Sequence, residues 1–184
     1  MSDLLPIELW KSAVMSPKET FAKEKKNASI TDGAKQLVVG GAIGGLVAGL
    51  FTMNPVAMVG MAVMGAIVAP IAMLIGTAVM WVIAKLLGGK GAYSTQYYVT
   101  ALFAAPLYPI AMIPVVGMLA SLYELYLAYL MLKEVHDFDS MKAIIVLAIP
   151  LVIAIVIGMV AAAAIIAMIG AAGMAGLSGG VPGY

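Results

Sequence analysis

The chain has 184 residues, of which 64% are hydrophobic and 10% charged, and its formal net charge is +1. Soluble domains carry about a quarter charged residues, so this composition and a mean hydropathy of +1.08 exclude an ordinary soluble domain and predict a multi-spanning membrane protein. The small net charge gives no case for nucleic acid as a partner. Because cysteine is absent, disulfides, thiolate metal sites and a cysteine nucleophile are excluded, and the redox compartment stays undetermined.

Residues 1–33 form the one sizeable polar segment, which we expect to be cytoplasmic and amphipathic. Its apolar residues favour two short interfacial helices, with Trp10 at the headgroup level. Ser16 to Glu19 has the pattern of a capping box with Pro17 at the first helical position. A disordered tail is the alternative. No apolar run precedes residue 34, so we expect no cleavable signal peptide.

Five apolar segments follow and predict an all-α integral membrane protein, a five-helix transmembrane bundle over residues 34–170 with a flexible tail over 171–184. Asn54 and Pro55 are expected to start the second helix as N-cap and first residue. That segment is too long for one upright crossing, so we favour a single tilted helix kinked at Pro70 over a re-entrant first half. The predicted spans are residues 34–53, 55–87, 94–113, 115–132 and 141–169.

Glycines mark two features of these segments. Gly41, Gly45 and Gly49 recur at a spacing of four in the first span, a pattern that lets another helix backbone come close and therefore predicts a packing face. The run Gly88–Gly91 ends the second span, since helix C-termini favour glycine in the left-handed conformation.

Lysine sets the predicted topology, because the chain has no arginine. With five spans, all ten lysines fall on one side of the membrane, which the positive-inside rule makes cytoplasmic. The N-terminus is therefore expected in the cytoplasm and the C-terminus outside. The lysines are Lys11, Lys18, Lys23, Lys25, Lys26, Lys35, Lys85, Lys90, Lys133 and Lys142.

Glu124 is the one acidic residue inside a predicted span. A carboxylate in hydrocarbon needs a partner, water or a proton, and helical spacing places Glu124 on the small-residue face of its helix. The predicted partners are Tyr97, Tyr108, Lys85 and the carbonyls released by Pro106 and Pro109. This set is either an intramembrane polar cavity for a proton, an ion or a lipid headgroup, or a protonated or paired glutamate that ties helices together.

The remaining polar residues suggest no enzyme. Tyr93, Tyr97 and Tyr98 are expected to anchor the membrane interface with Trp10, and Lys90 to meet lipid phosphates. His136 has acidic neighbours that suit a weak metal site, but a solvated loop explains them better. Neither catalytic nor nucleotide-binding motifs are present. We therefore predict no catalytic residue, no metal and no cofactor.

Several short motifs occur in a fixed order along the chain: Trp10, Ser16–Pro17–x–Glu19–x–Phe21, Gly88–Gly89–Lys90–Gly91–x–Tyr93, Ala105–Pro106, Leu132–Lys133–x–Val135–His136, Lys142–Ala143 and Pro150. With these residues the chain resembles the Yip1 domain family over most of its length. The resemblance implies five spans and a cytoplasmic N-terminus. The eukaryotic branch is associated with Rab-type GTPases and vesicle traffic, but its Asp-Leu-Tyr-Gly-Pro signature is absent here, which argues against a GTPase partner. The chain is more similar to the prokaryotic branch, which implies the plasma membrane.

Two functional hypotheses follow. In the first, the protein is a non-enzymatic organiser of membrane or membrane-protein assembly that acts through its N-terminal segment and lateral helix contacts. In the second, it is a transporter, channel or lipid-translocating protein whose path passes Glu124. The expected partners are membrane lipids and, through the glycine face, a second copy of the chain; the protein partner is unknown.

Overall fold

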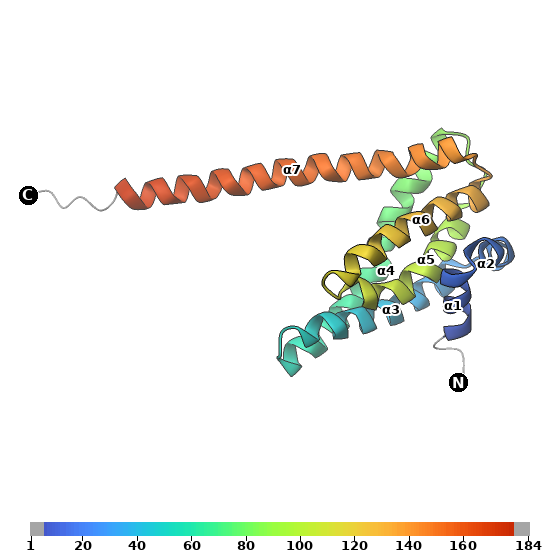
Figure 1. Cartoon of the computed structure of the whole chain (residues 1–184), viewed down its shortest axis with the longest axis horizontal. Helices are drawn as coiled ribbons and strands as arrows, with labels where there is room; N and C mark the ends of the chain where they lie inside the picture. Colours follow the sequence, from blue (N-terminus) through green and yellow to red (C-terminus); the bar gives the residue numbers. More distant parts are fainter. Residues whose placement is uncertain (1–5, 179–184) are drawn as a thin grey trace, which may run out of the picture. The chain divides into compact units, whose positions relative to one another are not determined.

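The computed structural model describes residues 6–178, and every regular element in that range is helical. The helices are α1 (Ile7–Met15), α2 (Pro17–Glu24), α3 (Ile30–Leu50), α4 (Pro55–Leu86), α5 (Tyr93–Ala111), α6 (Val116–His136) and α7 (Ser140–Ser178), with a 3₁₀ turn, η1 (Lys25–Asn27), after α2 (Figure 1). A first compact unit ends at Leu147 and a second begins at Ala148, within α7.

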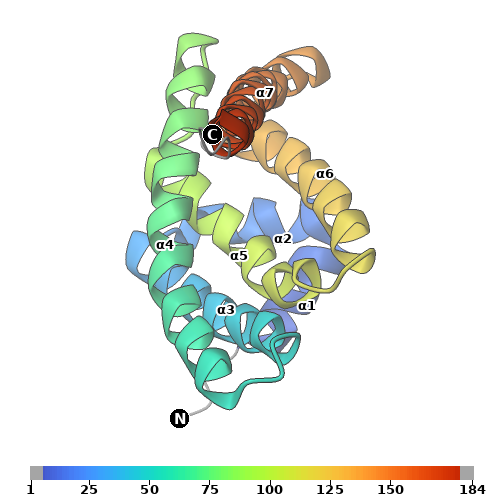
Figure 2. The same cartoon turned by 90° about the vertical axis from the view of Figure 1, so that its left-hand side faces the viewer.

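The first unit is organised around α5. Helix α3 packs against both α4 and α5, and α5 also contacts α6 and α1; Figure 2 shows α5 between α4 and α6. Eleven of its nineteen residues are buried. Since lipid touches little of α5, this helix can carry polar residues that a lipid-facing helix cannot.

Four helices in the described part of the chain are long and apolar enough to cross a membrane: α3, α4, α6 and residues Ser140–Met168 of α7. Helix α5, which covers most of the predicted span 94–113, is not among them. Residues 55–86 form one continuous helix with Pro70 inside it, and not a helix interrupted by a loop.

The α3–α4 hairpin depends on the predicted glycine face. A Cβ on Gly41 would overlap the Gly65 carbonyl oxygen, and a Cβ on Gly45 would overlap that of Met61. Gly40, on the neighbouring face of α3, lies in the same way against the Ala105 carbonyl of α5. The glycines therefore bring α3 close to two helices of its own chain.

Two local predictions, the N-cap at Asn54 and the left-handed glycine after α4, are confirmed. Asn54 caps α4, because its Oδ1 accepts hydrogen bonds from the backbone N–H groups of Val56 at 2.9 Å and Ala57 at 3.2 Å. Gly88, after the end of α4, has a φ of +86°, the left-handed conformation expected at a helix C-terminus.

Three local predictions are wrong. The Ser16 side chain makes no cap hydrogen bond; instead the Thr20 hydroxyl donates to the carbonyls of Ser12 and Ser16. Helix α6 continues past residue 132 to His136 and ends at Asp137, whose φ of 54° is left-handed, so the loop before α7 is short. The predicted tail is helical to Ser178; residues 179–184 lie outside the described part.

Candidate functional site

A row of polar side chains on α5 faces the backbone of α4. Residues 93, 96 and 97 share one side of the helix because positions three or four apart lie above one another. Each donates a hydrogen bond to a carbonyl of α4: Tyr93 to Leu74 at 2.8 Å, Gln96 to Thr77 at 3.1 Å and Tyr97 to Pro70 at 3.4 Å. In an apolar medium these bonds hold α5 against α4 in one register.

His136 extends this row to α6. Its Nε2 lies 2.8 Å from Gln96 Oε1, and both side chains are buried, at 1% and 0% exposure. Because the Gln96 amide nitrogen donates to Thr77, its oxygen faces the histidine, so the proton of the ring is on Nε2. Within residues 6–178, Nδ1 is a buried atom without a hydrogen-bond partner. Thr77, Gln96 and His136 thus tie three helices together.

The glycine turn after α4 covers His136. A Cβ on Gly89 would lie 2.5 Å from His136 Nδ1, and one on Gly91 would lie 2.5 Å from Val135 Cγ1. The Lys90 backbone N–H donates to the His136 carbonyl at 3.4 Å, and the Phe138 ring stacks on the imidazole at 5.4 Å. Two of the segments that carry the family resemblance, around Gly89 and His136, therefore pack against each other.

The interpretation of His136 as part of a solvated loop is wrong, because the residue is helical and buried. Its acidic neighbours have other roles: Asp137 is paired with Lys90 at 3.4 Å, and Asp139 caps α7 by accepting from the Lys142 N–H at 2.9 Å. The described residues contain no cluster of histidine and carboxylate groups that could hold a metal ion.

In the described part of the chain, no hydrogen bond joins any two of the four residues predicted to form one intramembrane site. Glu124 is half-buried on α6 and has no hydrogen-bond partner among residues 6–178. Tyr108 of α5 lies against Gly44 of α3. Tyr97 bonds to α4, as described above. Lys85, near the end of α4, donates to the Lys90 carbonyl at 3.3 Å and lies 5.6 Å from the Trp81 ring centre.

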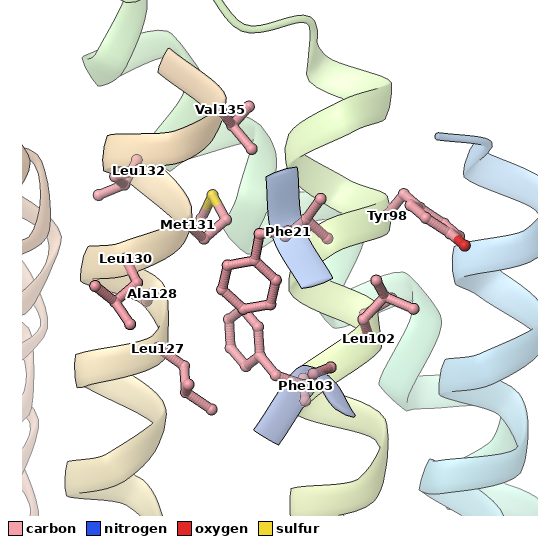
Figure 3. Close-up of a cluster of buried hydrophobic side chains, with 14 of the residues drawn as sticks. Phe21, Tyr98, Leu102, Phe103, Leu127, Ala128, Leu130, Met131, Leu132 and Val135 are labelled. Carbon is pink, nitrogen blue, oxygen red and sulfur yellow. The ribbon is translucent and has the colours of Figure 1, made fainter. Parts of the chain in front are cut away.

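The N-terminal helices pack on the bundle through an aromatic contact. Phe21 of α2 is fully buried between α5 and α6 (Figure 3). Its ring centre lies 5.7 Å from that of Phe103, and Leu127 and Met131 of α6 lie beside the two rings. Burying a phenylalanine is worth about 1.5–3 kcal/mol. The apolar side of α2 therefore faces protein, and not only the lipid interface.

Polar contacts secure the same helices to three partners. Trp10 and Tyr98, predicted at the headgroup level, both take part: Trp10 Nε1 donates to Gln36 Oε1 on α3 at 2.7 Å, and Tyr98 donates to Glu24 at 3.3 Å. The other contacts join Tyr123 to the Val14 carbonyl at 2.6 Å and Lys25 to Glu134 at 2.8 Å.

Sequence reasoning missed the two glutamines at the centre of these contacts, Gln36 and Gln96. Each is an amide within an apolar helix and is at least nine-tenths buried, and a buried amide requires hydrogen-bond partners. That requirement was the available signal. The sequence could not name the partners, because they lie 26 and 40 residues away.

The family model described as the Yip1 domain matches residues 11–163 of the chain. Comparison with curated proteins gives no match, and comparison with solved structures gives none either. The matched range includes the aromatic contact at Phe21, the glycine turn and His136.

Proposed function

Because the chain belongs to the Yip1 domain family, we propose that it is a five-span, non-enzymatic organiser of membrane or membrane-protein assembly. The N-terminus lies in the cytoplasm and the C-terminus outside, in a prokaryotic plasma membrane. Membrane lipids are its first partners.

Burial of α5 supports the fifth span. At 1.5 Å per residue its nineteen residues extend about 28 Å, close to the ~30 Å of a bilayer core. Its low hydropathy follows from its position among α3, α4 and α6. Counting α5 as a span also keeps all ten lysines on one side.

The observation that carries the proposal is the docking of α1 and α2 on the bundle. Phe21 and the four polar contacts fix these helices, while Lys11, Lys18, Glu19, Lys23 and Lys26 are exposed. The result is a charged surface attached to the spans at their lysine-rich end. Such a surface suits contact with other proteins or with lipid headgroups.

The interior of the first unit fits a structural scaffold better than a transport pathway. The row Tyr93–Gln96–Tyr97 uses its hydrogen bonds on neighbouring helices. The grooves that the described residues form at α1 and α2, between α1 and α3, and along the glycine face of α3 are lined by residues other than Glu124. The glycine face of α3 is occupied by α4 and α5, so self-assembly would use another surface.

A transporter or lipid-translocating protein remains the second candidate, and Glu124 is the observation that favours it. Its half-buried carboxylate lacks a hydrogen-bond partner in the described range, and an intramembrane ionisable residue suggests a functional site.

Site-specific photo-crosslinking in native membranes tests the proposal. A photoreactive residue at Lys18 should give discrete protein adducts, whereas one at the exposed, apolar Val63 of α4 should label lipid. Phe21→Ala should weaken the Lys18 adducts, because it loosens α2 from the bundle. Identical labelling at both sites, together with flux in proteoliposomes that Glu124→Gln abolishes, would replace the organiser with the transporter.

A further inference from the structure

A groove of about 560 Å³ runs between α1 and the first half of α3. Leu9 of α1 and Val38 and Val39 of α3 form its apolar part, and Thr31, Asp32, Lys35 and Gln36 supply polar groups. It lies apart from Glu124 and from the glycine turn.

The groove is polar at one end and apolar at the other, as a lipid molecule is. Thr31 and Val39 are eight residues apart, which is about 12 Å along a helix axis. A bilayer has headgroup regions of roughly 5–8 Å on each side of its hydrocarbon core. The polar end of the groove therefore lies at headgroup depth when the apolar end lies among acyl chains.

Gln36 places an unused donor in this groove. The side chain is 7% exposed, and its oxygen accepts from Trp10, which fixes the amide with its nitrogen on the other side. That nitrogen has no acceptor among the described residues 6–178, and it is not sealed inside the protein, since His136 Nδ1 is the buried side-chain atom without a partner in that range. Because Gln36 lines the groove, an ester or phosphate oxygen there could accept from its amide nitrogen.

Asp32 and Lys35 supply one charge of each sign at the groove's polar end. Their side chains form an ion pair at 2.8 Å but are 53% and 71% exposed. Exposed pairs of this kind are weak and exchange partners readily. A headgroup with a phosphate and a terminal primary ammonium offers the matching charges, the phosphate for Lys35 and the ammonium for Asp32. A primary ammonium also donates hydrogen bonds to a carboxylate, which the methylated ammonium of choline cannot do.

We propose that this groove binds one glycerophospholipid with an ethanolamine-type headgroup. The phosphate lies at Lys35 and Thr31, the ammonium at Asp32, an ester oxygen at the Gln36 amide, and an acyl chain between Leu9 and the valines of α3. The proposal requires only that the chain is embedded in a membrane, so it stands whichever of the two functional candidates holds.

Fluorescence of Trp10 tests the site in the purified full-length chain. Trp10 and Trp81 are the two tryptophans, so Trp81→Phe leaves a single reporter beside the groove. Lipids brominated on the acyl chain, added at increasing fractions to nanodiscs of unbrominated phosphatidylcholine, quench a tryptophan that lies close to them, and Trp10 is hydrogen-bonded to Gln36 in the groove wall. Brominated phosphatidylethanolamine should quench Trp10 at lower fractions than brominated phosphatidylcholine or phosphatidylglycerol.

Two variants separate the headgroup contacts. Asp32→Asn should remove the preference for phosphatidylethanolamine over phosphatidylcholine, and Lys35→Gln should weaken binding of both by about two- to fivefold, the range expected for exposed charge pairs. Lys26→Gln, an exposed lysine outside the groove, is the matched control and should change neither. Unchanged Trp10 emission in unbrominated lipid shows that each variant is folded.

Equal quenching by the three lipids would overturn the proposal, because it would describe ordinary contact with the bilayer. A preference for phosphatidylglycerol that survives Asp32→Asn would overturn the ethanolamine assignment. Quenching of Trp10 that Lys35→Gln leaves unchanged would place the lipid somewhere other than this groove.

Discussion

The close approach of α3 and α4 makes a sharp prediction for Gly45→Ala. A Cβ at this position would overlap the carbonyl oxygen and carbon of Met61, and would also lie too close to Ala62 Cα. All three are backbone atoms, so no side chain can rotate away to make room. The substitution must therefore move one helix relative to the other.

The magnitude follows from two opposing effects. Overpacking of a tight interface costs about 1–3 kcal/mol, while replacing glycine by alanine within a helix gains about 0.5–1 kcal/mol. Gly76 of α4 isolates the second effect, because a Cβ there meets no atom within 4 Å. We expect Gly45→Ala to lower the free energy of unfolding by about 1–2 kcal/mol, and Gly76→Ala to leave it unchanged or raise it by up to about 1 kcal/mol.

Reversible unfolding in mixed detergent micelles measures both variants under one set of conditions. Gly45→Leu should be worse than Gly45→Ala, since a larger side chain separates the helices further. If Gly45→Ala were as stable as Gly76→Ala, α3 and α4 could not be in contact at this point, and the packing of the hairpin would have to be redrawn.

Three further predictions concern the polar groups and the topology. His136→Leu should cost about 1–3 kcal/mol, because it leaves Gln96 Oε1 buried without a donor, and adding Gln96→Leu should cost less than the sum of the single changes in the same unfolding assay. Single cysteines replacing Asn54 and Ser178 should react with an impermeant label in intact cells, and one replacing Lys90 only after permeabilisation; a protected residue 178 would refute five spans. Glu124→Gln should keep the fold, since an amide also donates and accepts, whereas Glu124→Leu should destabilise it; a Leu variant as stable and active as wild type would show that Glu124 has no polar partner of consequence.

Local chemistry was readable from the sequence where it depends on neighbouring residues. The cap at Asn54, the left-handed Gly88 and the continuous helix through Pro70 each follow from residues within one or two turns. The glycine spacing of α3 likewise predicts a close helix contact. The spacing does not predict that both α4 and α5 pack against these glycines, because that depends on the path of the chain after α3.

Contacts between distant residues were not readable. His136 looked like a loop residue because Asp137 and Asp139 follow it, yet Lys133, Glu134 and Val135 extend α6 and turn His136 towards Gln96. Phe21 looked like part of an interfacial helix, and its partner Phe103 is 82 positions away in the sequence. An amphipathic pattern shows that one face is buried, but protein and lipid headgroups can bury it equally well.

The contacts that hold the first unit together differ between the two ends of α3. Near its start, where Gln36 and Gly33 lie, the neighbouring helices are joined by side-chain hydrogen bonds, with Gln96 of α5 between α4 and α6. Towards its end, α3 is held to α4 by close backbone contacts at Gly41, Gly45 and Gly49 and not by side-chain hydrogen bonds.

Hydrogen bonds between side chains can be exchanged for bonds to a lipid, a partner or water, whereas glycine contacts are lost only if the helices separate. Rearrangement on binding should therefore begin at the end that carries α1, α2 and the glycine turn. The α3–α4 hairpin should remain closed while it happens.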